Sequence, residues 1–204
     1  FVYPSKDFKA VHSYTNEVQA YVGGKNVECV DGTLLIHTKK EKCNAAAWHP
    51  QKGMIMHDFE YTSDVVSKKD LELTEGSVVQ VKARCRGFLN HGIYLRSANH
   101  APFISVFNYT GLKMYCGVKN NANEAEQLFE LSGLQPIPYL IFTVYWGKDE
   151  IVWYVNNLEV HRVKNTIPKG EKLYLTMYSF QFNGKYTTEG TLEVDWVKAF
   201  KINA

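Results

Sequence analysis

The chain has 204 residues, enough for one large domain with a substantial core, and its net charge of +2 is spread along the sequence. A nucleic-acid-binding surface normally shows a concentrated basic patch, so we expect no nucleic-acid partner. No apolar run approaches the length of a membrane span, so we expect no membrane insertion.

Short runs of alternating apolar and polar residues, separated by turn residues, recur along the chain. The run 33–36 follows an Asp31-Gly32 turn, and 77–86 alternates small apolar residues with polar ones. The runs 151–155 and 158–163 meet at Asn156-Asn157, a pair that tolerates the positive φ angles of a type I′ hairpin.

The last third of the chain continues this pattern. Residues 173–182 form a long aromatic-rich run, and near the end Leu192, Val194 and Trp196 share one predicted face. Trp146 and Trp153 are also expected in the core, and 121–131 is the one plausible helix. The whole predicts an all-β fold, a two-sheet antiparallel β-sandwich, formed by residues 1–204 as a single domain.

The four cysteines, Cys29, Cys43, Cys85 and Cys116, have no CxxC spacing and no histidine set nearby. We expect buried free thiols, although one or two disulfides would be possible in an oxidising compartment. The seven histidines show no HxH or HxxxH spacing, so we expect no metal site for catalysis and no cofactor.

Several segments, in this order and spacing, resemble glycoside hydrolase family 16, the β-jelly-roll glucanases and galactanases of the concanavalin A-like superfamily. They are 16–21 (NEVQAY), 26–36 with its Asp-Gly-Thr turn, 59–63 (FEYTS), 146–156 (WGKDEIVWYVN) and 194–197 (VDWV). The resemblance implies two stacked sheets, one of them concave, with polysaccharide lying across the concave face. A structural calcium is common in that family, but nothing in this sequence identifies ligands for one.

The same resemblance places the family's catalytic acids on residues 102–111 (PFISVFNYTG). A bulged Glu-x-Asp-x-x-Glu pattern falls on Phe103, Ser105 and Asn108, none of which is a carboxylic acid. Retaining hydrolysis requires two carboxyl groups a short distance apart. We therefore predict no catalytic residue at these positions.

Carboxylates elsewhere in the sequence are candidates for displaced acids. Asp58, Glu60 and Asp64 precede this strand, and Glu124, Glu126 and Glu130 follow it. We expect all six to be solvated, as carboxylates on a strand or helix surface usually are.

The leading hypothesis is a catalytically degenerate protein that binds an extracellular polysaccharide or oligosaccharide through aromatic rings, amides and hydroxyls. Trp48, Phe103 and Tyr109 would stack on sugar rings, and Asn90, His91 and Asn108 would form hydrogen bonds. The other expected binding residues are His49, Tyr94, Ser105, Tyr178 and Gln181.

Two alternative functions are also compatible with the sequence. One is a polysaccharide-degrading enzyme, either a hydrolase with displaced acids or a lyase that uses Tyr94 and His91 with Arg84, Arg86 or Arg96 as the cation. The other is a structural or adhesive domain. The resemblance further suggests an exported, bacterial protein, in the periplasm, at the cell surface or secreted, and we expect a monomer.

Overall fold

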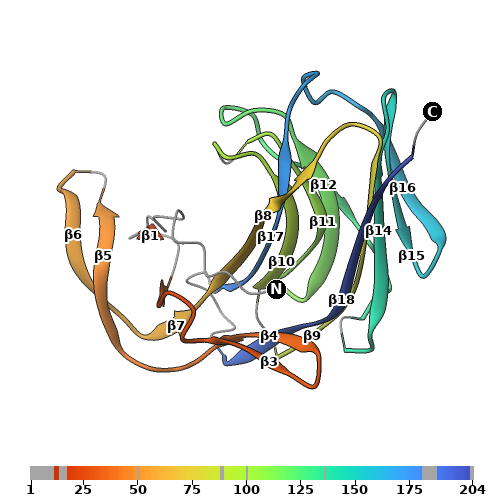
Figure 1. Cartoon of the computed structure of the whole chain (residues 1–204). Coiled ribbons are helices and arrows are strands. Elements are labelled where there is room, and N and C mark those ends of the chain that lie inside the picture. The colour runs from red at the N-terminus through yellow and green to blue at the C-terminus, as the bar shows by residue number, and fades with distance from the viewer. Residues whose placement is uncertain are drawn as a thin grey trace.

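Alternation of apolar and polar side chains builds two large antiparallel sheets in the computed structural model (Figure 1). The structure describes residues 12–13, 18–49, 51–87, 90–99, 101–135, 137–180 and 188–202. These ranges contain strands and no helix, so none of them holds a helix that could cross a membrane. The predicted all-β sandwich is confirmed.

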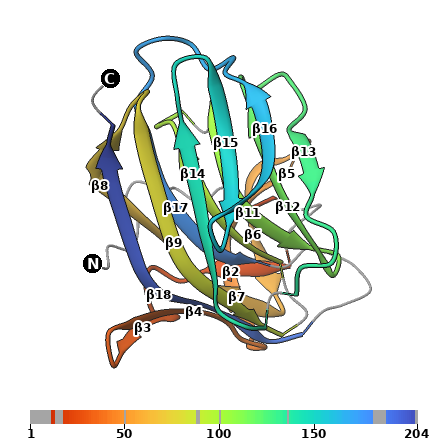
Figure 2. The same ribbon diagram turned by 90° about the vertical axis from the view of Figure 1, so that its right-hand side faces the viewer.

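The first large sheet has seven strands in the order β16-β15-β14-β9-β18-β4-β3 (Figure 2). Their bounds are β3 Val27–Val30, β4 Thr33–Thr38, β9 Ser77–Arg86, β14 Leu140–Trp146, β15 Glu150–Val155, β16 Leu158–Lys164 and β18 Gly190–Lys201.

The second large sheet has six strands in the order β13-β12-β11-β10-β17-β8. Their bounds are β8 Val65–Leu73, β10 Asn90–Arg96, β11 Phe103–Thr110, β12 Lys113–Lys119, β13 Gln127–Glu130 and β17 Leu173–Phe180. Figure 1 shows these strands bent so that the face turned away from the seven-stranded sheet is concave. We call this the outer face.

The core fills the space between the two sheets. The rings of Phe107 on β11 and Phe142 on β14 stack with centroids 4.3 Å apart. The indole N–H of Trp153 donates to the backbone carbonyl of Ser105 at 2.8 Å, which ties the two sheets together at the middle of β11. Trp146 and Trp153 are both buried, as predicted.

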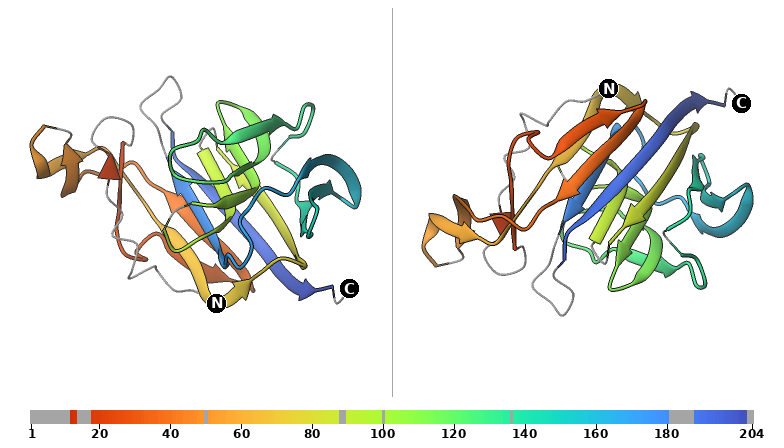
Figure 3. Two further views of the ribbon diagram at one scale, coloured as in Figure 1. Left: turned by 90° about the horizontal axis from the view of Figure 1, so that it is seen from above. Right: turned by 90° about the horizontal axis from the view of Figure 1, so that it is seen from below.

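A smaller three-stranded sheet, β1-β5-β6, stands beside the sandwich (Figures 1 and 3). It contains β1 His12–Ser13, β5 Cys43–His49 and β6 Gly53–Phe59. The short strands β2 Gln19–Tyr21 and β7 Tyr61–Ser63 pair in parallel. Ala47 and Phe59 form a separate small core with Ala20.

Backbone angles confirm the predicted hairpin at Asn156-Asn157 and the predicted turn at Asp31-Gly32. Asn156 and Asn157 have φ values of 49° and 67°, and Asp31 and Gly32 have 49° and 79°. Positive φ at both central residues is what a type I′ turn requires, and asparagine, aspartate and glycine adopt it at the least cost.

Three predictions were wrong. Residues 127–130 of the expected helix instead pair with β12 as β13. Trp196 is only half-buried, because a register shift between Val194 and Trp196 changes which residues of β18 face the core. All four cysteines are free thiols, but Cys29 is exposed and Cys43 half-buried, so only two are buried.

Candidate functional site

A bulge in β11 places Phe103, Ser105 and Asn108 on the outer face. In the pairing with β12, Ser105 lies opposite Gly117 and Asn108 lies opposite Tyr115. An advance of three residues along β11 therefore corresponds to an advance of two along β12. The residues between them, Val106 and Phe107, belong to the core. The three positions that the resemblance assigns to catalytic acids therefore share one face, as a bulge permits.

Strand register arranges the outer face as three rows that cross the sheet. The first row contains Tyr174, Arg96, Phe103 and Lys119. The middle row contains Ser67, Thr176, Tyr94, Ser105, Gly117 and Leu128. The third row contains Val65, Tyr178, Gly92, Asn108, Tyr115 and Glu130.

The rows differ in exposure. In the middle row the residues from Ser67 to Gly117 are all buried, whereas each residue of the first row is half-buried. Tyr178 and Tyr115 in the third row are also half-buried. The middle row is thus a floor, and the aromatic and basic side chains beside it are the parts that a ligand can reach.

Tyr94 forms the centre of this floor. Its ring stacks on that of Tyr178, with centroids 5.2 Å apart and planes 6° apart, and meets Phe103 edge-on at 5.5 Å. A Cβ atom on Gly92 would lie 2.2 Å from Cε2 of Tyr94. Glycine at this position is therefore what allows the tyrosine ring to lie over the strand.

A carboxyl group reaches the floor from outside the sheet. Ser105 Oγ donates to Glu126 Oε1 at 2.6 Å. Burial raises the pKa of Glu126, although the Ser105 hydrogen bond and the charges of Lys119 and Arg96 oppose the rise. The expectation that Glu126 is simply solvated is wrong.

Burial also raises the pKa of the Tyr94 phenol. Its pKa lies well above the usual range, because of burial first and then of the neighbouring Tyr178 and Glu126. A phenol held neutral in this way donates hydrogen bonds but is a poor base near neutral pH.

His91 and Tyr109 lie on the opposite side of their strands. They pair directly across β10 and β11, in phase with the core residues Ile93 and Phe107. Tyr109 is part of the core cluster, and burial raises its pKa. His91 is fully buried, which lowers its pKa to about 3. We therefore correct both assignments: neither residue belongs to the outer face.

Two asparagines do lie on the outer face. Asn90 alternates with Gly92 and Tyr94 along β10, and Asn108 lies directly opposite Gly92. Both are about nine-tenths buried, with 8% of the residue exposed. The buried Oδ1 of Asn108 has no hydrogen-bond partner among the described residues, so it is an acceptor that a ligand hydroxyl or a water would satisfy.

Two further expected binding residues, Trp48 and His49, do not lie on the six-stranded sheet. Trp48 and His49 lie on β5 of the three-stranded sheet, and the His49 ring accepts a hydrogen bond from the backbone of Gln51 at 3.1 Å. Gln181 lies outside the described residues.

The other displaced carboxylates have local partners. Asp58 accepts from Asn44 on the β5–β6 hairpin at 2.6 Å. Asp64 is buried and accepts the backbone N–H groups of Gly24 and Asn26, each at 2.9 Å, so it is a structural clamp rather than a solvated residue. Burial raises its pKa despite these bonds.

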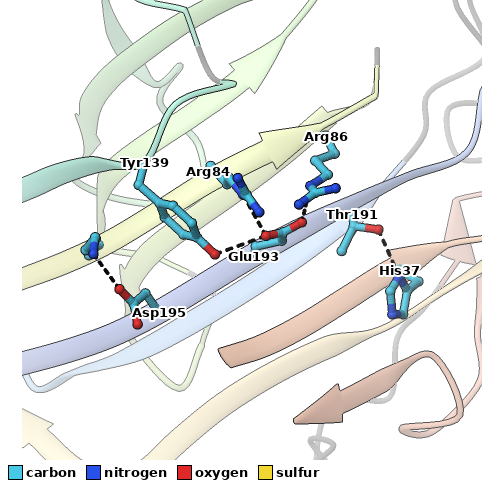
Figure 4. Close-up of polar contacts among 8 residues, drawn as sticks. His37, Arg84, Arg86, Tyr139, Thr191, Glu193 and Asp195 are labelled. Carbon is cyan, nitrogen blue, oxygen red and sulfur yellow. Dashed lines mark hydrogen bonds and ion pairs between the residues drawn. The ribbon is translucent and has the colours of Figure 1, made fainter. Parts of the chain in front are cut away.

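A second polar cluster lies on the far side of the seven-stranded sheet (Figure 4). The buried carboxylate of Glu193 accepts hydrogen bonds from Arg84 at 2.7 Å and from Tyr139 at 3.0 Å, and it also pairs with Arg86. The two arginines therefore do not lie on the outer face, which removes them from the lyase hypothesis. Among the described residues, no group of three or more metal-ligating side chains is assembled.

Solved glucanase structures share this arrangement of strands. An endo-β-1,3-glucanase from Pyrococcus furiosus superposes with a TM-score of 0.71 at 18% identity, covering 91% of this chain and 80% of that one. A β-1,3-1,4-glucanase (lichenase) derived from a mouse hindgut metagenome gives 0.70 at 17%, covering 93% and 89%. The protein has the β-jelly-roll glucanase fold.

A third neighbour is a κ-carrageenase from Pseudoalteromonas carrageenovora, solved with an oligosaccharide of κ-carrageenan. It superposes with a TM-score of 0.65 at 15% identity, covering 93% of this chain and 87% of that one. No family model and no curated protein sequence match the chain. At these identities the likeness extends to the fold.

Proposed function

We propose that this protein binds a polysaccharide across the outer face without hydrolysing it by the two-carboxylate mechanism. One observation carries the proposal: the structure brings Phe103, Ser105 and Asn108 onto the outer face in the positions expected of catalytic acids, and none of them is an acid. The solved neighbours act on β-glucans and carrageenan, which supports a carbohydrate as the ligand.

The chemistry of the outer face suits a sugar. The half-buried rings of Phe103 and Tyr178 would cover the apolar faces of sugar residues, as aromatic rings do in ligand sites. Asn108 and the Ser105–Glu126 pair would hydrogen-bond to hydroxyl groups. The rows cross the strands, so an extended chain lying along them would contact several strands at once.

A polysaccharide-degrading enzyme is the second candidate, and Glu126 is the observation that favours it. Its raised pKa is a property of a general acid in glycoside hydrolysis, and it reaches the position of the central family acid through Ser105. The lyase that would pair Tyr94 with His91 is disfavoured, because His91 faces the core and Tyr94 is held neutral.

The test measures binding and cleavage together on a panel of β-glucans, agarose, carrageenan and uronate polymers. We expect binding to at least one polymer, with no release of reducing ends. Phe103→Ala and Tyr178→Ala should each weaken binding by about three- to tenfold, the value of roughly 0.5–1.5 kcal/mol for an aromatic contact. Phe129→Ala is the matched control, because Phe129 packs on His161 away from the outer face.

Two results would decide against the proposal. Reducing ends that disappear in Glu126→Gln would establish the enzyme instead. Binding that survives both aromatic substitutions would move the site to another surface. The proposal carries with it an exported location, because a polysaccharide of this kind is met outside the cell.

A further inference from the structure

The edge of β6 that faces away from β5 is the feature of this molecule that the outer face does not explain. β6 is the last strand of the β1-β5-β6 sheet and the outermost strand of the hairpin that stands away from the sandwich (Figures 1 and 3). Within the described residues, no strand pairs with its far side. An edge of this kind presents unpaired backbone N–H and C=O groups to any strand that approaches.

The edges of the two large sheets carry the features that normally prevent such pairing. β8 has the Lys68–Asp70 ion pair and an irregular register with β17. β16 has Arg162, which pairs with Glu150 and Glu159, and an irregular register with β15. β3 and β13 are only four residues long. Charges, bulges and short strands are the usual protections of an edge.

β6 lacks most of these protections. It is seven residues long, contains no lysine, arginine or proline, and pairs with β5 without a register shift. Its solvent-facing side is apolar except for Asp58 near its end: Met54 is 55% exposed and Met56 63%, and Trp48, opposite Met54 on β5, is 50% exposed. A regular, largely apolar edge strand with a single acidic residue near its end is suited to pairing with another strand.

Self-pairing has one register that satisfies both the apolar and the charged side chains. In an antiparallel pair, opposite residues share a face, so exposed residues must meet exposed residues. Centring the pair on Ile55 places Met54 opposite Met56 of the second copy. The same register brings Lys52, in the turn before β6, opposite Asp58 of the second copy. Centring it on Met56 would instead set Met54 against Asp58.

We propose that two copies of this chain pair through β6, antiparallel and centred on Ile55, to form one continuous six-stranded sheet from two three-stranded ones. The strip of Trp48, Met54 and Met56 would continue across the twofold axis, flanked at each end by a lysine–aspartate pair. This pairing takes the place of the monomer expected from the sequence.

The expected affinity of the dimer follows from the small area that the interface would bury. A single pair of seven-residue strands buries less than the roughly 1,200–2,000 Å² of a standard interface. We therefore expect a dimer that dissociates on dilution, with a dissociation constant on the order of micromolar.

The experiment measures the mass of the full chain by sedimentation over a concentration series. We expect a monomer–dimer equilibrium that Met56→Lys weakens by at least about tenfold, because it sets a charge against Met54 of the second copy. Lys52→Asp and Asp58→Lys should each weaken the dimer through like-charge pairs, and the two together should restore it. Circular dichroism of each variant confirms that the fold is kept.

Cross-linking tests the register directly. In a Cys29→Ser background, Met54→Cys and Met56→Cys chains should form a disulfide dimer when mixed and not when either is alone. A dimer that forms from Met56→Cys alone would show the register centred on Met56. A monomer at every concentration would overturn the proposal. A dimer unaffected by Met56→Lys and by the charge exchange would also overturn it, because the two copies would then associate through another surface.

Discussion

The buried imidazole of His91 makes a quantitative prediction about stability against pH. Its pKa is lowered from an ordinary 6.5 to about 3 by burial. Between these values the unfolded chain binds a proton at this histidine and the folded chain does not. The free energy of unfolding therefore falls as the pH falls below 6.5, and this contribution levels off below pH 3.

The magnitude follows from the two pKa values. One unit of pKa corresponds to about 1.4 kcal/mol, so acidification from about pH 6 to about pH 4 should cost about 2.5 kcal/mol through His91 alone. Asp64 and Glu126, whose pKa values are raised, contribute with the opposite sign. They are present in wild type and variant alike, so the difference between the two isolates His91.

The assay is urea denaturation of the wild type and His91→Leu at several pH values. We expect the stability of the variant relative to the wild type to rise by about 2.5 kcal/mol between about pH 6 and about pH 4. Ile93→Val, two residues along on the same face of β10, is the control: it should cost about 0.5–1.5 kcal/mol equally at both pH values. A parallel pH dependence in wild type and His91→Leu would refute the core placement of this residue.

Three other predictions concern the outer face and the opposite sheet. Gly92→Ala should displace the Tyr94 ring and lower the free energy of unfolding in urea by about 1–3 kcal/mol. It should also weaken binding to any polysaccharide that the wild type binds. Unchanged stability and binding would show that the position of the ring does not depend on this glycine. Ser105→Ala removes the hydrogen bond that lowers the pKa of Glu126, so NMR titration of that carboxyl should show a further rise, and an unchanged or lower pKa would contradict the contact. Glu193→Gln should lower the free energy of unfolding in urea by about 1–3 kcal/mol, because it weakens a buried acceptor shared by two arginines and a tyrosine. The control is Glu159→Gln, which removes the charge from the exposed pair with Arg162 and should cost under about 1 kcal/mol. Equal costs would show that the burial of Glu193 adds nothing to stability.

Turn residues and alternation of apolar and polar side chains are local signals, and they predict the strands whose formation depends on neighbouring residues. The β15–β16 hairpin was predicted because Asn156 and Asn157 tolerate positive φ, and β9 because its alternation runs over ten residues. Trp196 was placed wrongly because the register shift beside it depends on pairing with β9, and nothing in the local sequence marks it. The expected helix at 121–131 failed because β12 offers an edge to residues 127–130.

The site was predicted only in part, for the same reason. The bulged alignment placed Phe103, Ser105 and Asn108 on one face, which the register confirms. The phase of β10 would have excluded His91, because it alternates with Ile93 and Leu95. No local signal identifies Glu126, since its position depends on how the segment before β13 crosses the sheet.

The bulge in β11 separates two sets of constraints on one strand. Ile104, Val106 and Phe107 fill the core, while the indole of Trp153 holds the backbone carbonyl of Ser105 whatever side chain that residue carries. Side chains on the outer face can therefore be exchanged without repacking the interior. A strand built in this way lets evolution, or an engineer, rewrite the chemistry of the surface while the scaffold beneath it stays the same.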